Sequence, residues 1–297
     1  MQKQVNKFYI ILIFFLSADL YSQSLIFKSN LSDQNYSAKK NKFEFLSSPE
    51  IFSPLKASIF ESRIGGWKDL NNNLVRLDIG YSPDIISFRH RRSVASIGVD
   101  FFTFSSLRSE VNFKFPVEAI DYNFGLKFSY HKPINKKLSL EGRFRLAHIS
   151  SHLQDGYKYE RTDTIFTPFV YSREYIDLSA ILNYNYSKRI LFRTQLSLNY
   201  LINSKPDDFG KLYLQFGFEK YIKIFKKINF YFSNEFRLVS VKSSSNLNYN
   251  LETGFKFGGL NTRGVSLFFT YYDGQDYRGQ FYNKYLNYKA IGFTFDI

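Results

Sequence analysis

The stretch HISSHLQDGY, residues 148–157, holds two of the four histidines of the chain beside two serines. On an extended strand, side chains two residues apart lie on the same face, so His148 and Ser150 are neighbours. An imidazole in that position can accept the hydroxyl proton of a serine and make the serine a nucleophile. A third group must orient the imidazole, and Glu174 on the following segment is the candidate. The spacing predicts Ser150 as nucleophile, His148 as general base and Glu174 as the orienting carboxylate.

The direction in which this strand faces decides what such a site can reach. In residues 138–152 the even positions are apolar, apart from a glycine, as far as Leu146 and continue as His148 and Ser150, whereas the odd positions include the charged residues. The cluster therefore continues the apolar face of the strand. If the hairpin that follows pairs symmetrically, Ser150 lies opposite Glu174, and the carboxylate is diagonal to His148 and within reach of it.

Two other interpretations of the stretch stay open. Histidine and serine suit a boundary between lipid and water, where one end of a side chain is wet, and this interpretation assigns them no chemistry. A metal site would use His148, His152 and Asp155, although positions i and i+4 of a strand lie far apart unless the chain bends. A hydrolase would also need a donor for the developing oxyanion, either a loop amide near Gly156 or a bound divalent cation.

The rest of the chain alternates apolar and polar residues in long segments. In residues 119–130 the even positions are mostly large and apolar and the odd positions mostly polar. Strands of this length with aromatic faces are typical of a closed antiparallel β-barrel in the outer membrane rather than of a soluble sandwich. The expected strands, about twelve and even in number as in single-chain bacterial barrels, are residues 55–63, 73–81, 94–105, 118–130, 137–151, 173–187, 189–201, 210–222, 227–241, 246–258, 264–273 and 285–297.

The start of the chain and its composition fit export. Residues 1–22 carry Lys3 and Lys7 ahead of an apolar run and are predicted to be a secretory signal peptide. Residues 23–54 are then an N-terminal periplasmic segment and 55–297 the transmembrane barrel. The chain has 34 Phe, 23 Tyr and no Cys, so neither a disulfide nor a thiolate metal site can hold it together. Its net charge of +14 favours an anionic membrane surface as partner over nucleic acid.

The expected barrel has a charged interior and polarised ends. If both ends of the barrel are periplasmic, the short connections fall on the periplasmic side, with residues 82–93 as the exception, and the longest insertion, 152–172, falls outside. Trp67, Tyr271 and Tyr272 are expected to anchor the membrane interface. Charges of both signs point inward and predict a salt-bridged polar plug, with an anion-selective pore as the alternative: Glu141, Arg143, Arg145, Asp177, Arg193, Lys211, Glu219, Glu235, Arg237, Glu252 and Lys256.

Several runs carry a family resemblance. SPLKASIFES, HISSHLQD, SREYIDLS and RGQFY resemble a Gram-negative envelope family known as the domain of unknown function DUF1207. That resemblance implies a barrel and brings no established activity. The pair His148 and Ser150, with Glu174, also resembles the sites of two outer-membrane lipid hydrolases, phospholipase A and the lipid A deacylase. In both, a His-x-Ser pair lies on the barrel exterior near the outer leaflet.

Two functions follow from these patterns. The first is an outer-membrane barrel that acts as a serine esterase on outer-leaflet phospholipid or lipid A. The second is a structural or transport barrel with a salt-bridged lumen and no enzymatic activity. Either barrel would have outer-membrane lipid as a partner. The C-terminal run KAIGFTFDI, with Phe293, Phe295 and Ile297 on one face, resembles the signal that the outer-membrane assembly machinery recognises. The substrate and the oligomeric state are left open by the sequence.

Overall fold

The computed structural model describes residues 42–47, 50–155, 157, 166–242, 244–259 and 263–296. The predicted signal peptide lies outside the described residues, as does Ile297. No helix within these ranges is long and apolar enough to cross a membrane. The strands are β1 (Lys42–Ser47), β2 (Ile64–Asp69), β3 (Leu74–Tyr81), β4 (Asp84–His90), β5 (Ser93–Arg108), β6 (Val117–Pro133), β7 (Leu138–Leu153), β8 (Tyr171–Ser187), β9 (Ile190–Lys205), β10 (Leu212–Phe225), β11 (Ile228–Val241), β12 (Ser244–Gly258), β13 (Gly264–Gln275) and β14 (Tyr285–Asp296), with short 3-10 turns η2 (Val111–Phe113) and η4 (Gly279–Phe281).

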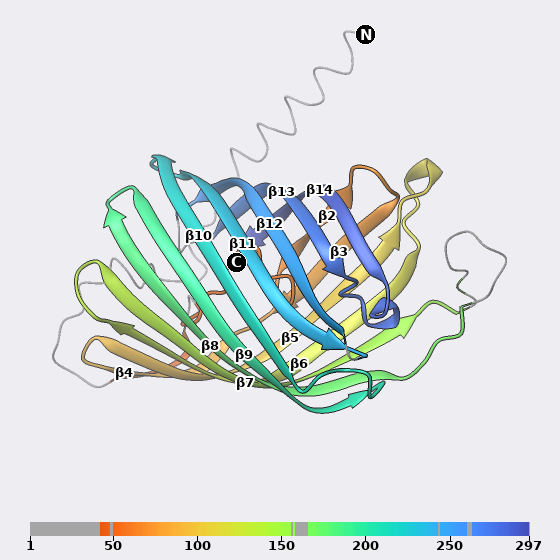
Figure 1. Cartoon of the computed structure of the whole chain (residues 1–297). Helices are drawn as coiled ribbons and strands as arrows, with labels where there is room; N and C mark the ends of the chain where they lie inside the picture. Colours follow the sequence, from red (N-terminus) through yellow and green to blue (C-terminus); the bar gives the residue numbers. More distant parts are fainter. Residues whose placement is uncertain are drawn as a thin grey trace, which may run out of the picture.

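The sheet closes on itself. Consecutive strands pair from β5 round to β14, β14 pairs with β2, β2 with β3, and β3 returns to β5. Each strand of this circuit has a neighbour on both sides, so the exposed edges that invite aggregation are absent from the circuit. The described strands thus form the closed 12-stranded antiparallel barrel that the alternation predicted (Figure 1).

The start of the barrel differs from the expectation. Residues 55–63 are not a strand, because the sheet pairing of β2 begins only at Ile64. Residues 82–93, expected to be the one long connection at the periplasmic end, are mostly strand instead, because β4 continues β3 along the same side of β5. Only Ser82 and Pro83 separate β3 from β4. Proline has no N–H to donate to a ladder, so it interrupts the strand without ending it.

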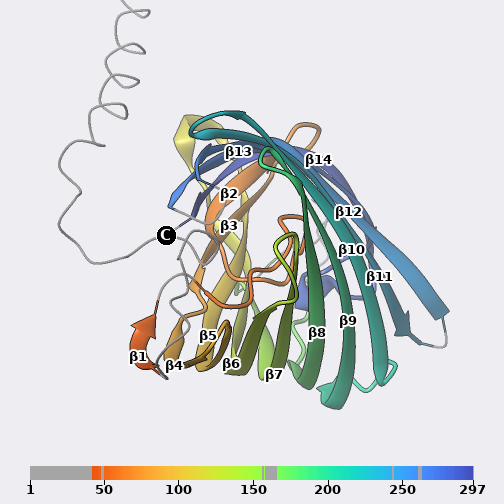
Figure 2. The same ribbon diagram turned by 90° about the vertical axis from the view of Figure 1, so that its left-hand side faces the viewer.

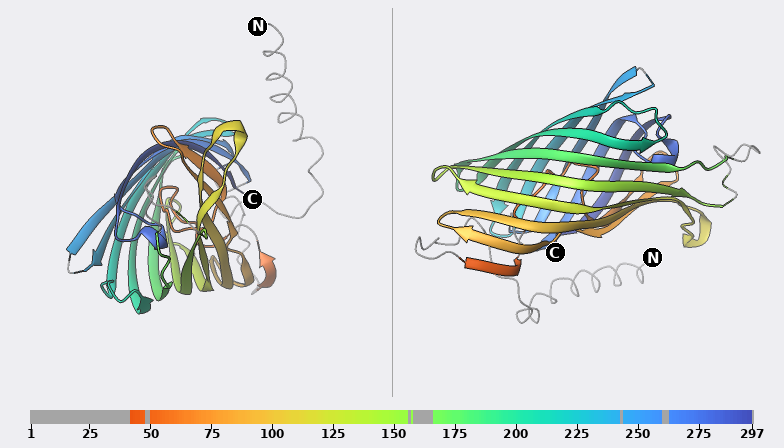
Figure 3. Two further views of the ribbon diagram at one scale, coloured as in Figure 1. Left: turned by 90° about the vertical axis from the view of Figure 1, so that its right-hand side faces the viewer. Right: turned by 90° about the horizontal axis from the view of Figure 1, so that it is seen from below.

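The two ends of the barrel differ in the length of their connections. At the short-turn end the chain reverses at residues 91–92, 134–137, 188–189 and 226–227, and β12 ends and β13 begins there. The opposite, long-loop end carries the longer connections, among them 109–116, 154–170 and 276–284. Figure 2 looks onto the short-turn end and the left panel of Figure 3 onto the long-loop end. This polarity is the one expected from the sequence.

Residues 50–63, here called the plug segment, run through the interior of the barrel instead of forming a strand (Figure 2). Its apolar side chains are buried except for Phe60, which is partly buried, and Phe52 is only 1 % exposed. Its backbone is held by lumenal side chains. The amide of Ser53 donates to Glu141 at 3.0 Å, the amide of Lys56 donates to Glu219 at 2.6 Å, and the carbonyl of Ala57 accepts from Asn250 at 2.6 Å. Hydrogen bonds to the wall thus replace the strand ladder that these backbone groups lack.

One carboxylate ties the plug segment to the barrel wall. Glu61 accepts two hydrogen bonds from Arg143, at 2.6 and 2.8 Å, and further ones from Arg145 at 3.1 and 3.2 Å. Asp177 on the next strand accepts from Arg143 at 3.0 Å. These groups are all buried, and a buried charge is tolerated when it is paired and hydrogen-bonded in this way. The salt-bridged plug expected from the sequence is therefore present, although its central acid comes from the plug segment.

Not every residue that was expected to face inward does so. Lys211 is exposed at the long-loop end, because it precedes β10 and lies outside the alternation of that strand.

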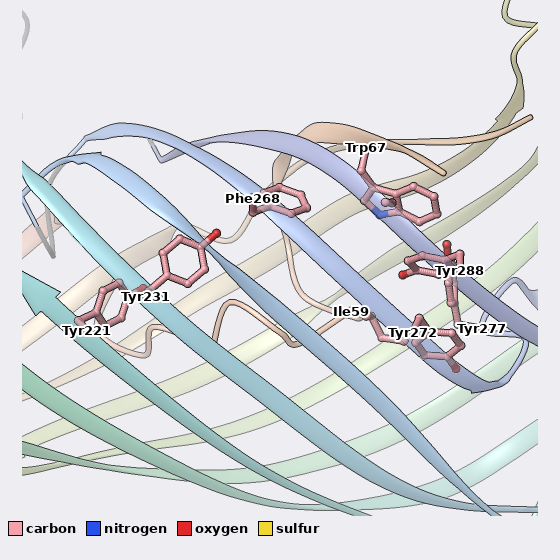
Figure 4. Close-up of a cluster of buried hydrophobic side chains, with 9 residues drawn as sticks. Ile59, Trp67, Tyr221, Tyr231, Phe268, Tyr272, Tyr277 and Tyr288 are labelled. Carbon is pink, nitrogen blue, oxygen red and sulfur yellow. The ribbon is translucent and has the colours of Figure 1, made fainter. Parts of the chain in front are cut away.

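The expectation that Trp67 and Tyr272 anchor the membrane interface is also wrong. Both are buried in the lumen, where Trp67 stacks on Tyr288 at 4.3 Å between ring centroids, and Tyr272 stacks on Tyr288 at 5.4 Å (Figure 4). Adjacent residues of a strand face opposite sides, so only Tyr271 of that pair faces out.

The long-loop end is covered by the β13–β14 connection. The Gly279 amide donates to both carboxylate oxygens of Asp121 at 3.2 Å, and the Gln280 amide group donates to the carbonyls of Ser151 and Phe169. A Cβ on Gly279 would lie 2.5 Å from that of Ser151, so only glycine fits this approach. The plug segment and the β13–β14 loop together occupy the lumen and its outer mouth.

The ion pairs of Glu61 make a prediction about stability. Glu61→Ala leaves Arg143 and Arg145 buried with one acid fewer, so the free energy of unfolding should fall by about 3–5 kcal/mol. Urea unfolding in detergent micelles, followed by fluorescence, measures it, because Trp67 is the single tryptophan and lies in the lumen. The matched control is Glu44→Ala, whose partner Lys42 is largely exposed, with an expected cost below about 1 kcal/mol. Equal losses in both variants would contradict the account of the plug segment.

Candidate functional site

β7 and β8 carry the candidate site on the outer face of the barrel. On β7, Arg143 and Arg145 point into the lumen, while Phe144 and Leu146 are exposed on the outside at 45 % and 44 %. The alternation continues without a break, so His148 and Ser150 also face outward and are half-buried. Ala147 and Ile149, between them, are buried. The predicted orientation of the pair is therefore present.

His148 and Glu174 lie directly opposite each other in the hairpin. The register pairs His148 with Glu174 and Ser150 with Ser172. His148 Nδ1 lies 2.8 Å from Glu174 Oε1. The expected register, with Ser150 opposite Glu174, is wrong by two residues, because the loop of 154–170 is too long for a symmetric turn to fix it. The consequence favours the predicted chemistry, because the carboxylate meets the imidazole directly instead of across a diagonal.

Two residues with no role in the sequence analysis complete the surroundings of this pair. Ser172 Oγ donates to the same Glu174 oxygen at 3.0 Å. Phe124, opposite His148 on β6, lies against the imidazole with 4.8 Å between ring centroids and 31° between the planes. The hydroxyl holds the carboxylate and the aromatic ring limits the tilt of the imidazole. His148, Ser150, Ser172 and Glu174 are called the outer cluster below.

A β-bulge lies beside the outer cluster. On the β8–β9 ladder Glu174 pairs with Asn203, but Tyr175 pairs with Leu201, so Ile202 is the extra residue. Both Ile202 and Asn203 are exposed as a result, where strict alternation would turn one of them inward. Bulges re-aim side chains and are frequent next to active sites. Here the bulge brings a side-chain amide alongside Glu174 on the outer face.

The catalytic arrangement also requires a hydrogen bond between Ser150 and the imidazole of His148. Glu174 occupies Nδ1, which leaves Nε2 as the nitrogen that can accept a proton from a serine. Among the described residues no hydrogen bond joins His148 to Ser150. The two residues share a face at a strand spacing of about 6.6 Å along the chain, and such catalytic contacts often shorten only when substrate binds.

The structure does not bring the residues of the predicted metal site together. His152 faces outward and packs edge-on against Tyr122, with 5.6 Å between ring centroids, and Asp155 is exposed at the start of the loop. Within the described part of the chain no group of three or more His, Asp and Glu residues is placed to hold a metal ion. Gly156, the expected source of an oxyanion amide, lies outside the described residues.

The outer cluster sits at the upper limit of an apolar belt. Towards the short-turn end, the outward residues of the same strands are apolar and exposed, as Leu126, Leu146 and Leu178 are. Towards the long-loop end, Tyr122 and His152 follow on the same face, and then the loops, where apolar residues such as Val170 are also exposed. A closed antiparallel barrel with an apolar outer band and unequal ends is an outer-membrane-type β-barrel.

Comparison with known proteins gives the family. The chain belongs to the family described as "Protein of unknown function (DUF1207)", whose model matches residues 114–297. Every residue of the outer cluster lies within that match. A comparison with curated proteins finds no match.

Solved structures with a similar fold include OmpT, an outer membrane protein of Vibrio cholerae, in its in-vitro folded form. It is 9 % identical, with a TM-score of 0.33, and the likeness covers 80 % of this chain and 99 % of that chain. The loop L8 deletion mutant of the same protein is 8 % identical with a TM-score of 0.32, covering 79 % and 99 %.

The placement of the outer cluster predicts that it contributes little to stability. His148→Ala, Ser150→Ala and Glu174→Gln change half-buried side chains on the outer face and should each alter the free energy of unfolding by less than about 1 kcal/mol. Asp177→Ala, three residues along β8 from Glu174, removes a buried acid paired with Arg143 and should cost about 3 kcal/mol. Urea unfolding followed by Trp67 fluorescence compares the four. If the outward variants lose as much as Asp177→Ala, the outer cluster is a structural element.

Proposed function

We propose that this protein is an outer-membrane serine esterase that hydrolyses acyl esters of lipids in the outer leaflet. The observation that carries the proposal is the 2.8 Å contact between His148 Nδ1 and Glu174 Oε1 on the outward face, with Ser150 two residues away on the same face. A carboxylate bound to one imidazole nitrogen fixes the tautomer in which the other nitrogen is a base.

The expected position of the barrel in the membrane determines which lipids the outer cluster can reach. With the short-turn end in the periplasm, the outer cluster borders the outer leaflet, where lipid headgroups meet the acyl chains. Acyl chains of a phospholipid or of lipid A can lie along Phe144 and Leu146, which are exposed just below the cluster. Their ester carbonyls then come to the level of Ser150. Binding by the lipid tails thus contributes to positioning the scissile bond.

The reaction follows from the three side chains. His148 Nε2 takes the proton of Ser150 as its oxygen attacks the ester carbonyl, and Glu174 stabilises the resulting imidazolium. The same proton then passes to the leaving alcohol, which leaves an acyl group on Ser150, and water releases the fatty acid by the reverse sequence. The oxyanion needs a donor, and Tyr122, which lies opposite Ser150 in register on β6, brings a hydroxyl group to this site.

The filled lumen argues against transport as the alternative function. The plug segment crosses the interior, and the β13–β14 loop covers the long-loop end through Gly279 and Gln280. A pore would require both to move, at the cost of the buried ion pairs of Glu61. The outer cluster needs no such movement, because it lies on the outer face.

The esterase predicts a strict dependence on one serine. Purified protein in mixed micelles should release fatty acid from phospholipid or lipid A, and Ser150→Ala should lower the rate by about a thousandfold or more. Glu174→Gln should lower it by about 10²- to 10⁴-fold, because the imidazole loses its orienting charge. The matched control is Ser151→Ala, the neighbouring serine, which is buried and faces inward and should leave the rate unchanged. Fatty-acid release that Ser150→Ala retains in full, with its barrel folded, would contradict the proposal.

A further inference from the structure

Exposed lysines and arginines occur at each described reversal of the short-turn end. They are Arg91 and Arg92 between β4 and β5, Lys132 at the end of β6 with Lys136 and Lys137 after it, Lys188 and Arg189 between β8 and β9, Lys223 at the end of β10 with Lys226 and Lys227 after it, and Arg263 before β13. No Asp or Glu occurs in the corresponding runs HRRS, HKPINKKLS, YSKRI, IKIFKKIN and FGGLNTRGV. These residues are called the basic collar below.

The long-loop end has a different charge pattern. Some of its exposed cations pair with acids, as Lys205 does with Asp207 at 3.1 Å and Lys242 with Asp208 at 3.7 Å. Two acids towards the short-turn end form ion pairs outside these runs. Asp296 pairs with Lys56 and Lys256, and Glu44 pairs with Lys42. Among the described residues, the short-turn end therefore carries cations in runs without an acid, whereas the long-loop end carries both signs of charge.

The surroundings of the basic collar indicate its partner. Ile134 and Phe225 lie within or beside the reversals and are 53 % and 66 % exposed, and Tyr186 precedes another and is 57 % exposed. Cations next to exposed apolar and aromatic side chains, at the edge of an apolar barrel wall, are typical of a membrane interface. The reversals are also spread over alternate strands around the circumference. A protein docks on one side of such a ring, whereas lipid headgroups surround it.

We propose that the basic collar binds the headgroups of anionic phospholipids in the periplasmic leaflet and so fixes the depth and orientation of the barrel. Lysine and arginine near a membrane surface are attracted to anionic lipids, and the attraction falls off with the Debye length. The proposal rests on the membrane placement given above and is independent of the esterase, because the basic collar lies at the end of the barrel away from the outer cluster.

Lipid retention by the purified barrel tests the proposal. The protein is equilibrated in neutral detergent with equal amounts of phosphatidylglycerol and phosphatidylcholine that have the same acyl chains. It is then exchanged into the same detergent without lipid, and native mass spectrometry counts the lipids of each kind that stay bound. We expect about a tenfold preference for phosphatidylglycerol, lost when the salt concentration is raised to about 1 M, where the Debye length is about 3 Å. Equal retention of the two lipids at low salt would overturn the proposal, as would a soluble polyanion bound in place of phosphatidylglycerol.

Two matched variants test whether the preference for phosphatidylglycerol comes from the basic collar. The collar variant changes Lys136, Lys137, Lys188, Arg189, Lys226 and Lys227 to Gln. The control variant changes the same number of exposed lysines at or near the long-loop end to Gln, namely Lys68, Lys114, Lys205, Lys211, Lys284 and Lys289.

The collar variant should lose the preference and the control variant should keep it. A third variant with Arg at the lysine positions of the collar variant keeps the charge and should retain the preference even if the Gln variant folds poorly. Heat-dependent migration on a gel checks the folding of each. If the control variant loses the preference as fully as the collar variant, or the Arg variant also loses it, the basic collar is not the site.

Discussion

The ion pairs between Glu61 and the two arginines of β7 join the plug segment to the barrel wall. Arg143 and Arg145 are charges that a barrel of this width must satisfy away from water, and the plug segment supplies their acid at 2.6–3.2 Å. The residues that alternate with them on β7, and the ones that follow, form the outer face. The strand that anchors the plug segment inside therefore also presents His148 and Ser150 outside. Because the inner face is fixed by buried pairs, the outer face has a fixed register on which a catalytic arrangement can be built.

The alternation of side chains made most of this fold predictable from the sequence. It gave the closed antiparallel barrel, the unequal ends, the inward charges of β7 and the outward position of His148 and Ser150. It did so because a period of two leaves no freedom once one face is apolar. The membership in the DUF1207 family, expected from HISSHLQD and related runs, is likewise confirmed.

The failures have equally physical causes. Residues 55–63 look like a strand, but they lie in the lumen, where the consecutive residues Ala57, Ser58 and Ile59 are all buried and alternation does not apply. Trp67 and Tyr272 suit a membrane interface by type but face inward by parity. The pairing of His148 with Glu174 depends on the register across a long loop and on the neighbouring bulge at Ile202, and neither can be read from local spacing. The contacts of Ser172 with Glu174 and of Phe124 with His148 were not predicted either, because only the pairing register shows which side chains of neighbouring strands meet.

The central claim is that Ser150 is an activated nucleophile on the lipid-facing surface. Its most direct measurement is covalent labelling of the folded barrel with a fluorophosphonate, followed by intact mass and peptide mapping. The account predicts one adduct, on Ser150, formed far more slowly in His148→Ala and Glu174→Gln and not at all in Ser150→Ala. Absence of an adduct in the wild type, or labelling of Ser150 at the same rate without His148, would contradict it.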